Sequence, residues 1–384
     1  MRRGGLRAVL TFALVIAAYL GLNFFIGWNA QTWLNAWLPG FPGAALWTLL
    51  ALAALGYLIG RLRFLPKPVG RGLKVFGAYY IGLFEYAVLL LPIADLAVWL
   101  FYEAGSDYKD TVESIGFVVA VLLLLLFAWG TWNAWTPIVR KYEIDVEKAA
   151  GGRRRMDIVL VSDLHLGNIV GNRHLDRLLP RVERIKPDLI LLAGDVLDDV
   201  IEPFIRNRMA ERLGRLAAPL GVYAVLGNHE YYGGHIEEYV ERMAALGIPV
   251  LRDERATPGG ILNVVGRKDK AAESMDPQGR KPVAELLKGV DRSLPIILMD
   301  HQPYGYAADE EAGVDIVVSG HTHRGQFAPN HWVTGRLFEL DWGYLRKGRM
   351  HAVVSSGYGT WGPPVRLASR SEIVHLSVTF SGGA

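Results

Sequence analysis

The chain has 384 residues, of which 51% are hydrophobic, and a formal net charge of +3 at pH 7. Because 41 Lys and Arg nearly balance 38 Asp and Glu, the charge gives no reason to expect a nucleic-acid partner. The absence of cysteine excludes disulfide bonds and thiolate metal sites, and it leaves the redox compartment open. The length is sufficient for two or three domains with sizeable cores.

The first 138 residues are predicted to lie in a lipid bilayer. Crossing the hydrocarbon core takes about 20 residues, and four apolar segments approach or exceed that length, at 6–27, 44–62, 76–101 and 115–135. One such segment is also typical of a globular core, but four in succession favour a transmembrane region. The first segment follows arginines, as a signal peptide does, yet it lacks a convincing cleavage site and is expected to be retained.

The charges of the loops predict the orientation. Basic residues precede the first segment and follow the second and fourth, whereas the loop after the first is uncharged and that after the third is acidic. Because positive loops stay in the cytoplasm, we expect a multi-pass inner-membrane protein with its N-terminus and soluble domain cytoplasmic, and residues 139–155 as a basic juxtamembrane linker. The basic residues are Arg2, Arg3, Arg7, Arg61, Arg63, Lys67, Arg71, Lys74, Arg140, Lys141, Lys148 and Arg153–Arg155.

Two carboxylates, Glu85 and Asp95, fall in the third apolar segment. Charged groups at membrane depth are costly, so the two residues mark a functional polar pathway, or else Asp95 lies near the outer interface and Glu85 pairs within the helix bundle. The sequence shows no partner for either residue, and both alternatives stay open.

From residue 156 onward the sequence predicts an α/β domain. Segments 173–185 and 236–246 have the pattern of helices, and they alternate with short apolar runs that predict strands. Such alternation is typical of layered folds with helices packed on sheets. The predicted strands are DIVLVSD, DLILLAGD, GVYAVLGN, LNVVG, LPIILMD, VDIVVSG and HAVVSSG.

Side chains able to bind metal follow five of these predicted strands. The carboxyl ends of strands form the ligand-binding edge of α/β sheets, and five of the chain's ten histidines fall there. Carboxylate, amide and imidazole donors without thiolate suit Mn, Fe, Zn, Ni or Co. Seven donors exceed the needs of one ion, which predicts two ions sharing a bridging carboxylate. The donors are Asp163, His165, Asp195, Asn228, His301, His321 and His323, with His229 beside them.

Five motifs in this half resemble those of one enzyme family. VSDLHLG, GDVLDD, GNHE, the histidine of MDHQP and SGHTH resemble, in order and spacing, the motifs of the calcineurin-like metallophosphoesterases. PDLILLAGD and SSGYGTWGPPVRL are similar to the membrane-associated bacterial YkuE/YaeI-like branch. The resemblance covers residues 156–384 and implies a layered β-sandwich flanked by helices. It also implies a hydrolase acting on phosphomonoester, phosphodiester or pyrophosphate bonds with manganese or another divalent metal.

The resemblance further implies a role for each residue of the predicted site. His229 would be catalytic, protonating the leaving oxygen, and a hydroxide bridging the two ions would be the nucleophile. The implied ligands of the first ion are Asp163, His165 and His323, those of the second are Asn228, His301 and His321, and Asp195 would bridge the two.

The chain departs from the family pattern at three motifs. Glu230 stands where many relatives have aspartate, and it either orients His229 or faces solvent. Many phosphoprotein phosphatases of this fold have an arginine shortly after the GD motif, where this chain has Asp198 and Asp199, which argues against protein phosphatase activity. Arg324, where the branch usually has glycine, is a candidate phosphate clamp or an outward surface residue, and Arg366 is a similar candidate.

These features together predict a membrane-anchored phosphohydrolase with two divalent ions. Tethering at the bilayer favours a lipid-linked substrate over other phosphorylated small molecules, although no specificity motif identifies one. Two alternatives remain: a non-catalytic scaffold of the same fold, and a membrane sensor or transporter regulated by the soluble domain. The substrate, the native metals and the oligomeric state are left open.

Overall fold

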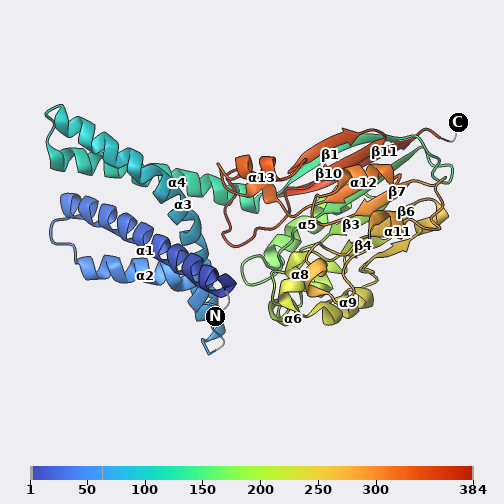
Figure 1. Ribbon diagram of the computed structural model, residues 1–384, viewed down its shortest axis with the longest axis horizontal. Coiled ribbons are helices and arrows are strands. Elements are labelled where there is room, and N and C mark those ends of the chain that lie inside the picture. The colour runs from blue at the N-terminus through green and yellow to red at the C-terminus, as the bar shows by residue number, and fades with distance from the viewer. Residues whose placement is uncertain (1–2, 63, 383–384) are drawn as a thin grey trace. The chain divides into compact units, whose positions relative to one another are not determined.

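The computed structural model describes residues 3–62 and 64–382, so Arg2 and Arg63 of the predicted charge pattern lie outside the described residues. The chain divides into two compact units between Trp129 and Gly130. The first unit is helical (Figure 1). Its helices are α1 (Arg3–Trp37), α2 (Gly43–Ile59), α3 (Lys67–Glu103) and α4 (Tyr108–Trp135), the last of which continues into the second unit.

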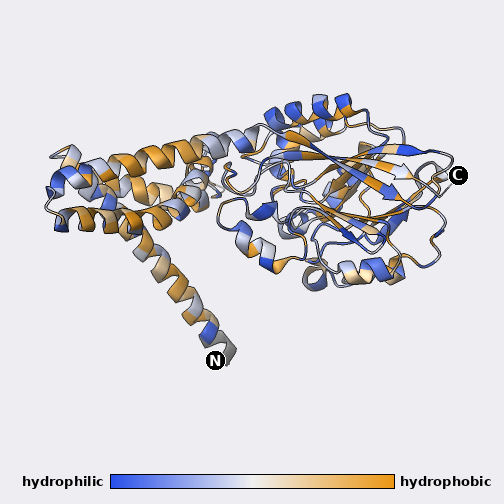
Figure 2. Ribbon diagram, turned by 90° about the horizontal axis from the view of Figure 1, so that it is seen from above, coloured by the Kyte–Doolittle hydropathy of each residue, from blue (hydrophilic) through white to orange (hydrophobic). Residues whose placement is uncertain are grey.

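Three of these helices, α1, α3 and α4, are long and apolar enough to cross a membrane, and α2 is apolar but spans 17 residues. Figure 2 shows their mainly hydrophobic composition. Helix α1 continues to Trp37, through much of the stretch expected to be a loop. The reason is local: no proline or glycine follows Gly27 until Pro39, so nothing interrupts the helix before LPGFPG.

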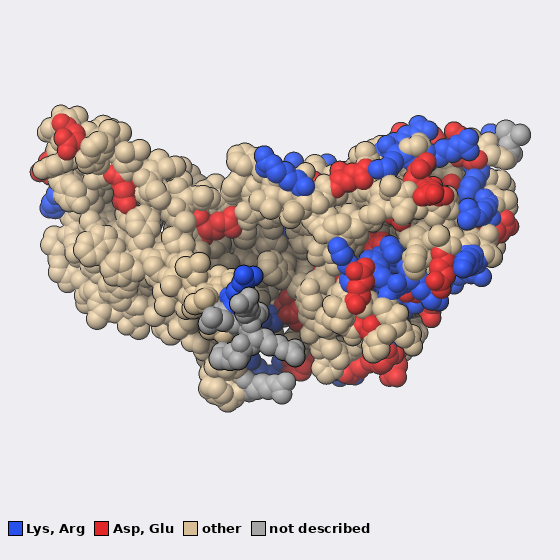
Figure 3. Space-filling view, in the orientation of Figure 1, with Lys and Arg blue, Asp and Glu red and all other residues tan. Residues whose placement is uncertain are grey.

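The surface of the helical unit is apolar. Phe12, Leu14 and Leu124 are 69%, 71% and 69% exposed, and many other large apolar side chains of these helices face outward. On the face drawn in Figure 3, charged side chains are sparse over these helices and gather on the other unit. A surface of this kind is stable in contact with lipid tails, because exposing so many apolar side chains to water is unfavourable.

The second unit contains two β-sheets. The first has the order β1-β11-β2-β3-β4 and the second the order β5-β6-β7-β8-β10-β9. Strands β2, β3 and β4 are mutually parallel, and so are β6, β7, β8 and β10. The strands are β1 (Ile138–Val146), β2 (Arg155–Val161), β3 (Leu189–Ala193), β4 (Val222–Val225), β5 (Glu254–Ala256), β6 (Asn263–Gly266), β7 (Ile296–Met299), β8 (Ile316–Ser319), β9 (Gly343–Lys347), β10 (Met350–Val354) and β11 (Glu372–Phe380).

The main core lies between the two sheets. Ile158 of β2 and Leu191 of β3 belong to the same buried cluster as Ile297 of β7 and Val318 of β8. A second buried cluster covers the other face of the second sheet, where Tyr306 and Leu286 from short helices pack on Leu298. Strands covered on both faces explain the continuous Val, Ile and Leu runs of the sequence.

Helices and short 3₁₀ turns connect the strands. Two of them, α5 (Asn172–Ile185) and α9 (Ile236–Ala245), occupy the predicted helical segments. The others are α6 (Glu202–Arg206), α7 (Met209–Leu213), α8 (Asn228–Gly233), η1 (Pro258–Gly260), α10 (Ala272–Met275), α11 (Val283–Leu286), α12 (Tyr306–Glu311), η2 (His323–Gly325) and α13 (His331–Leu337). The predicted α/β sandwich flanked by helices is confirmed.

The expected linker at 139–155 differs from the structure. Its first part is β1, which pairs in parallel with β11 at the edge of the first sheet. The strand alternates between more and less exposed positions, and Lys141 and Glu143 point outward. Charged residues on an edge strand are common because they discourage further pairing, and here they concealed the strand in the sequence.

Candidate metal centre

The seven predicted donors come together at the carboxyl ends of five strands. Asp163 and His165 follow β2, Asp195 follows β3, and Asn228 begins helix α8 just after β4. His301 follows β7, and His321 and His323 follow β8. The first three strands belong to one sheet and the last two to the other, so the donors meet where the edges of the two sheets converge.

One cluster consists of Asp163, His165 and His323, all buried, with one ligand atom from each within 4.8 Å of the others. Nε2 of His165 lies 3.0 Å from Nε2 of His323, which lies 3.5 Å from Oδ1 of Asp163. The second carboxylate oxygen of Asp163 is buried and has no hydrogen-bond partner among the described residues. A cation between these atoms would satisfy all three, so the donor set fits a divalent metal.

A second cluster consists of Asp195, His301 and His321. Nδ1 of His301 donates to the carbonyl of Ala193 at 2.8 Å, which leaves Nε2 as the ligand atom, 3.0 Å from Oδ2 of Asp195. Metal-binding histidines usually donate their other ring nitrogen to a carbonyl or carboxylate, which fixes the orientation of the ring. Oδ1 of Asn228 lies 2.8 Å from Nδ1 of His321, so the amide oxygen also reaches this cluster.

The backbone at these positions is strained. Five of the seven donors have φ between 46° and 72°, in the left-handed region that side chains other than glycine rarely adopt. They are Asp163, His165, Asp195, His321 and His323. Such strain costs about 1–3 kcal/mol per residue and persists at functional sites, where the surrounding fold holds it in place.

Glycines in two motifs make room for the carboxylates. A Cβ atom on Gly320 would overlap the carboxylate of Asp163, and one on Gly227 would overlap that of Asp195. Glycine is therefore required before His321 and before Asn228, because a carboxylate approaches the backbone closely at both positions.

Three of the imidazoles are held in the neutral form that metal binding requires. Burial lowers the pKa of His165 to about 4 and that of His321 to about 3, and it holds the pKa of His323 well below its usual range. Burial alone would also lower the pKa of His301, but the adjacent Asp195 carboxylate outweighs it and raises that pKa. Asp195 is thus the largest of the carboxylate contributions that raise the pKa of His301.

His229 lies beside the first cluster and is paired with an aspartate. Its ring is 4.7 Å from that of His165, and its Nδ1 lies 2.7 Å from Oδ1 of Asp199. Burial lowers the pKa of His229, but the Asp199 hydrogen bond and the nearby carboxylates outweigh burial and raise it to about 9. A protonated imidazole at neutral pH is suited to act as a general acid.

Glu230 does not orient His229, which corrects one of the two alternatives for this residue, and it is too buried to face solvent as the other supposed. Its carboxylate accepts hydrogen bonds from the amides of Gly227, Leu197 and Asp195 at 2.7, 2.8 and 3.2 Å. Glu230 therefore ties the loop after β3 to the start of α8. The carboxylate that contacts His229 is that of Asp199.

The two candidate substrate-binding arginines have different surroundings. Arg324 is partly exposed, has φ of 51° and lies with its guanidinium 4.2 Å from the ring centroid of Trp342. Arg366 is fully buried. Its guanidinium donates to the carbonyls of Ser356, Gly357 and Gly359, and lies 3.1 Å from Nδ1 of His323. Arg366 thus holds the loop at 356–359 by hydrogen bonds, and its buried guanidinium does not reach solvent.

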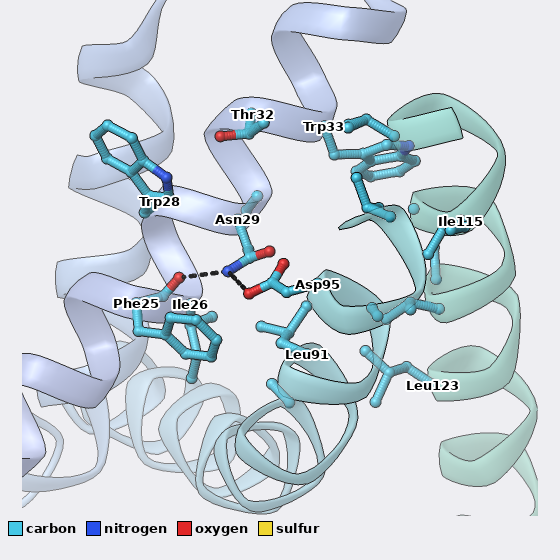
Figure 4. Close-up of a pocket in the computed structure, with 18 of the residues that line it drawn as sticks. Phe25, Ile26, Trp28, Asn29, Thr32, Trp33, Leu91, Asp95, Ile115 and Leu123 are labelled. Atoms are coloured by element: carbon cyan, nitrogen blue, oxygen red, sulfur yellow. Dashed lines mark hydrogen bonds between the residues drawn. The ribbon is translucent and has the colours of Figure 1, made fainter. Parts of the chain in front are cut away.

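The helical unit contains a separate cavity of about 1010 Å³ between α1, α3 and α4. Figure 4 shows Asp95 pointing toward Asn29, whose Nδ2 donates to the carboxylate at 3.3 Å and to the carbonyl of Phe25 at 3.3 Å. Asp95 therefore has a hydrogen-bond partner in α1, which the sequence did not reveal. Leu91, Trp33 and other apolar side chains form most of the lining.

The chain is similar in sequence to known proteins. Residues 156–325 match the family described as calcineurin-like phosphoesterase. A metallophosphoesterase of Aquifex aeolicus is 33% identical over 264 residues, which cover 68% of this chain and 99% of that protein. A transmembrane protein with metallophosphoesterase domain from Danio rerio is 32% identical over 285 residues, 71% of this chain and 63% of that protein.

The metallophosphoesterase YkuE of Bacillus subtilis is 27% identical over 226 residues, covering 56% of this chain and 76% of that protein. The predicted family and the predicted class of cofactor, divalent metal held by His and Asp clusters, are therefore confirmed. The sequence motifs, the fold that carries them and these relatives agree: the chain belongs to the calcineurin-like metallophosphoesterases.

Proposed function

We propose that this chain is a membrane-anchored phosphohydrolase that uses two divalent ions. The observation that supports this proposal best is the convergence of two donor clusters, in each of which the ligand atoms lie within 4.8 Å of one another, at the edges of the two sheets. Asp163, His165 and His323 would hold one ion. His301, His321 and Asn228 would hold the other, and Asp195 would be shared.

When bound, two divalent ions lower the pKa of water and neutralise negative charge on a phosphoryl group. The protein's own contribution is positioning and proton transfer. Because Nδ1 of His229 is paired with the Asp199 carboxylate, the imidazole keeps its second nitrogen for the substrate, and its raised pKa keeps a proton available there. His229 would deliver that proton to the leaving oxygen, which supplies about 10²–10⁴-fold in rate.

The apolar helices support a membrane location for the substrate as well as for the enzyme. A site tethered to the bilayer meets membrane-held phosphoesters at high effective concentration, so a lipid-linked phosphoester or pyrophosphate is the proposed substrate class. The loop charges support four crossings with the catalytic unit in the cytoplasm. A reporter enzyme fused after the C-terminus tests this orientation, and activity of a periplasm-specific reporter would contradict it.

The function is tested with the purified full-length protein in detergent and Mn²⁺. We expect metal-dependent hydrolysis of bis-p-nitrophenyl phosphate that is lost, together with bound metal, in Asp195→Asn. His235→Asn is the matched control, since His235 is exposed and lies outside both clusters. Equal activity of the Asp195 variant and the parent would contradict the catalytic proposal and favour the scaffold alternative.

The cavity in the helical unit favours a second candidate function, a membrane sensor whose helices bind a small apolar ligand. Its polar feature is the Asn29–Asp95 hydrogen bond, which a ligand with a hydroxyl or amine group would replace. Asp95→Asn separates the two functions. A sensor loses its membrane-dependent response in this variant, whereas the hydrolase retains its rate on bis-p-nitrophenyl phosphate.

A further inference from the structure

Helix α13 carries an outward-facing row of large apolar side chains. Trp332, Val333 and Leu337 are 63%, 56% and 66% exposed. At 100° per residue, these three and the exposed Arg336 share one side of the helix. The opposite side faces the protein, where Thr334 donates to Asp341 at 2.7 Å. Soluble proteins rarely expose contiguous apolar surface of this kind without a partner.

A further exposed aromatic residue, Trp361, is hydrogen-bonded to the segment that leads into α13. It is 57% exposed, and its backbone forms two hydrogen bonds with the side chain of Gln326, at 3.0 and 3.1 Å. Gln326 lies in the short segment between η2 and α13, so both parts of the surface are built on one segment. We name Trp332, Val333, Leu337 and Trp361 the apolar rim.

The apolar rim is unusual within its unit. Among the described residues 130–382, six large apolar side chains are more than half exposed, and four of them form the rim. The other two are Tyr232, which carries a hydroxyl, and Trp132, in the last turn of α4. The exposure of the rim is therefore a local feature, and the rest of the unit does not share it.

The loop that carries Trp361 is fastened to the last turns of α4. The amide of Arg366 donates to the carbonyl of Gly130 at 2.9 Å, and Nδ2 of Asn133 donates to the carbonyl of Arg366 at 3.2 Å. Farther along the loop, the amide of Ser371 donates to the carbonyl of Asn133 at 3.1 Å. Because α4 has the length and composition of a membrane span, the loop that carries Trp361 is fastened to the end of a candidate span.

The rim also adjoins the metal centre. Helix α13 begins eight residues after His323, and Phe338 at its end turns back toward the site. The ring of Phe338 lies 6.1 Å from that of His321 and 4.9 Å from that of Tyr304. The residue that follows α13 is thus in ring contact with the ligand His321.

We propose that the apolar rim docks on the surface of the lipid bilayer and opens the metal centre toward phosphoesters held there. Apolar and aromatic side chains enter the interface, while Arg336 remains level with lipid phosphates, as in interfacial amphipathic helices. The statement about substrate access rests on the proposed function, whereas docking itself requires only membrane anchoring. The partner is the bilayer and no other macromolecule.

Docking is tested by spin labelling, for which the absence of native cysteine is an advantage. Trp332→Cys, Leu337→Cys and Trp361→Cys, each labelled with a nitroxide, are compared in full-length protein reconstituted into phosphatidylcholine–phosphatidylglycerol vesicles. Val200→Cys and Glu241→Cys are the controls, since both positions are exposed on the same unit outside the rim. We expect the ratio of oxygen to nickel-chelate accessibility to be severalfold higher at the rim than at the controls.

Equal accessibility at rim and control positions would overturn the docking proposal. Substrate access is tested separately with the double variant Trp332→Ser and Leu337→Ser. It should hydrolyse bis-p-nitrophenyl phosphate as the parent does but lose most of its rate on a phosphodiester lipid in vesicles. An unchanged rate on the lipid overturns the access statement. If the parent protein hydrolyses neither substrate, the proposed function is contradicted. The docking proposal is still tested in that case, because the accessibility ratio does not depend on activity.

Discussion

Nδ1 of His229 and Oδ1 of Asp199 are 2.7 Å apart, and this contact determines the protonation state of the imidazole beside the metal ligands. Asp199 reaches His229 because its own backbone is left-handed, with φ of 56°, which turns its side chain back toward α8. The neighbouring Asp198 is also buried, and it adds negative charge near the ring without forming this contact.

We predict that Asp199→Asn shifts the alkaline limb of the pH–rate profile to lower pH. Burial lowers the pKa of His229, and Asp199 is the largest cause of its rise to about 9. Without that carboxylate the imidazolium loses its proton at lower pH, so the rate falls earlier as the pH increases. Measuring kcat against pH for an alkyl phosphodiester, whose leaving group needs the proton, tests this expectation.

The leaving group provides the control for that experiment. p-Nitrophenolate departs without protonation, so its ester should show a much smaller loss in Asp199→Asn and in His229→Asn. For the alkyl ester, His229→Asn should lower kcat by about 10²–10⁴-fold, the usual contribution of a general acid. Equal losses on both esters would show that Asp199 supports the fold and not proton transfer.

Glu230→Gln is expected to destabilise the protein by about 1–3 kcal/mol, the cost of leaving a buried donor unpaired. The carboxylate accepts from three amides, and a glutamine would direct its NH₂ group at one or two of them. Denaturant unfolding measures this change, with the exposed Glu241→Gln as control. An unchanged midpoint together with a shifted pH profile would instead assign Glu230 to the orientation of His229.

Arg366→Lys should lower stability and leave KM unchanged. The three carbonyls that Arg366 contacts lie in different directions around a planar guanidinium, and an ammonium group cannot reach them all. Each carbonyl left unpaired costs about 1–3 kcal/mol. Thermal unfolding tests the prediction against exposed Arg349→Lys. A raised KM with normal stability would restore Arg366 as a substrate ligand.

Arg324→Ala should raise KM by about 10-fold to 100-fold, which corresponds to one or two lost hydrogen bonds to a charged group. Its guanidinium rests on Trp342, which also contacts Arg140 at 4.6 Å and donates to Glu372 at 3.1 Å. Trp342→Leu should therefore raise KM to a smaller extent. Metal content measured on both variants is expected to equal that of the parent, and a loss of metal would show that Arg324 acts on the ligand loop instead.

Strand positions and the donors that follow them were predictable because both depend on local patterns. Each of the seven predicted runs contains a strand, and the Asp and His residues after them meet because parallel strands in a sheet end at a common edge. Strands β1, β5, β9 and β11 were not predicted. β1 and β11 pair across more than 230 residues of sequence, and charged or mixed edge positions weaken the local apolar signal.

The sequence by itself determined the family, the two-part organisation and the set of metal-binding residue types, because these follow from composition, period and motif spacing. Only the tertiary structure decided what the charged neighbours do. Asp199, Glu230 and Arg366 are all polar residues near motifs, yet one pairs with His229, one holds three amides and one is buried behind His323. These choices depend on backbone direction and on contacts between distant segments, which a linear pattern does not contain.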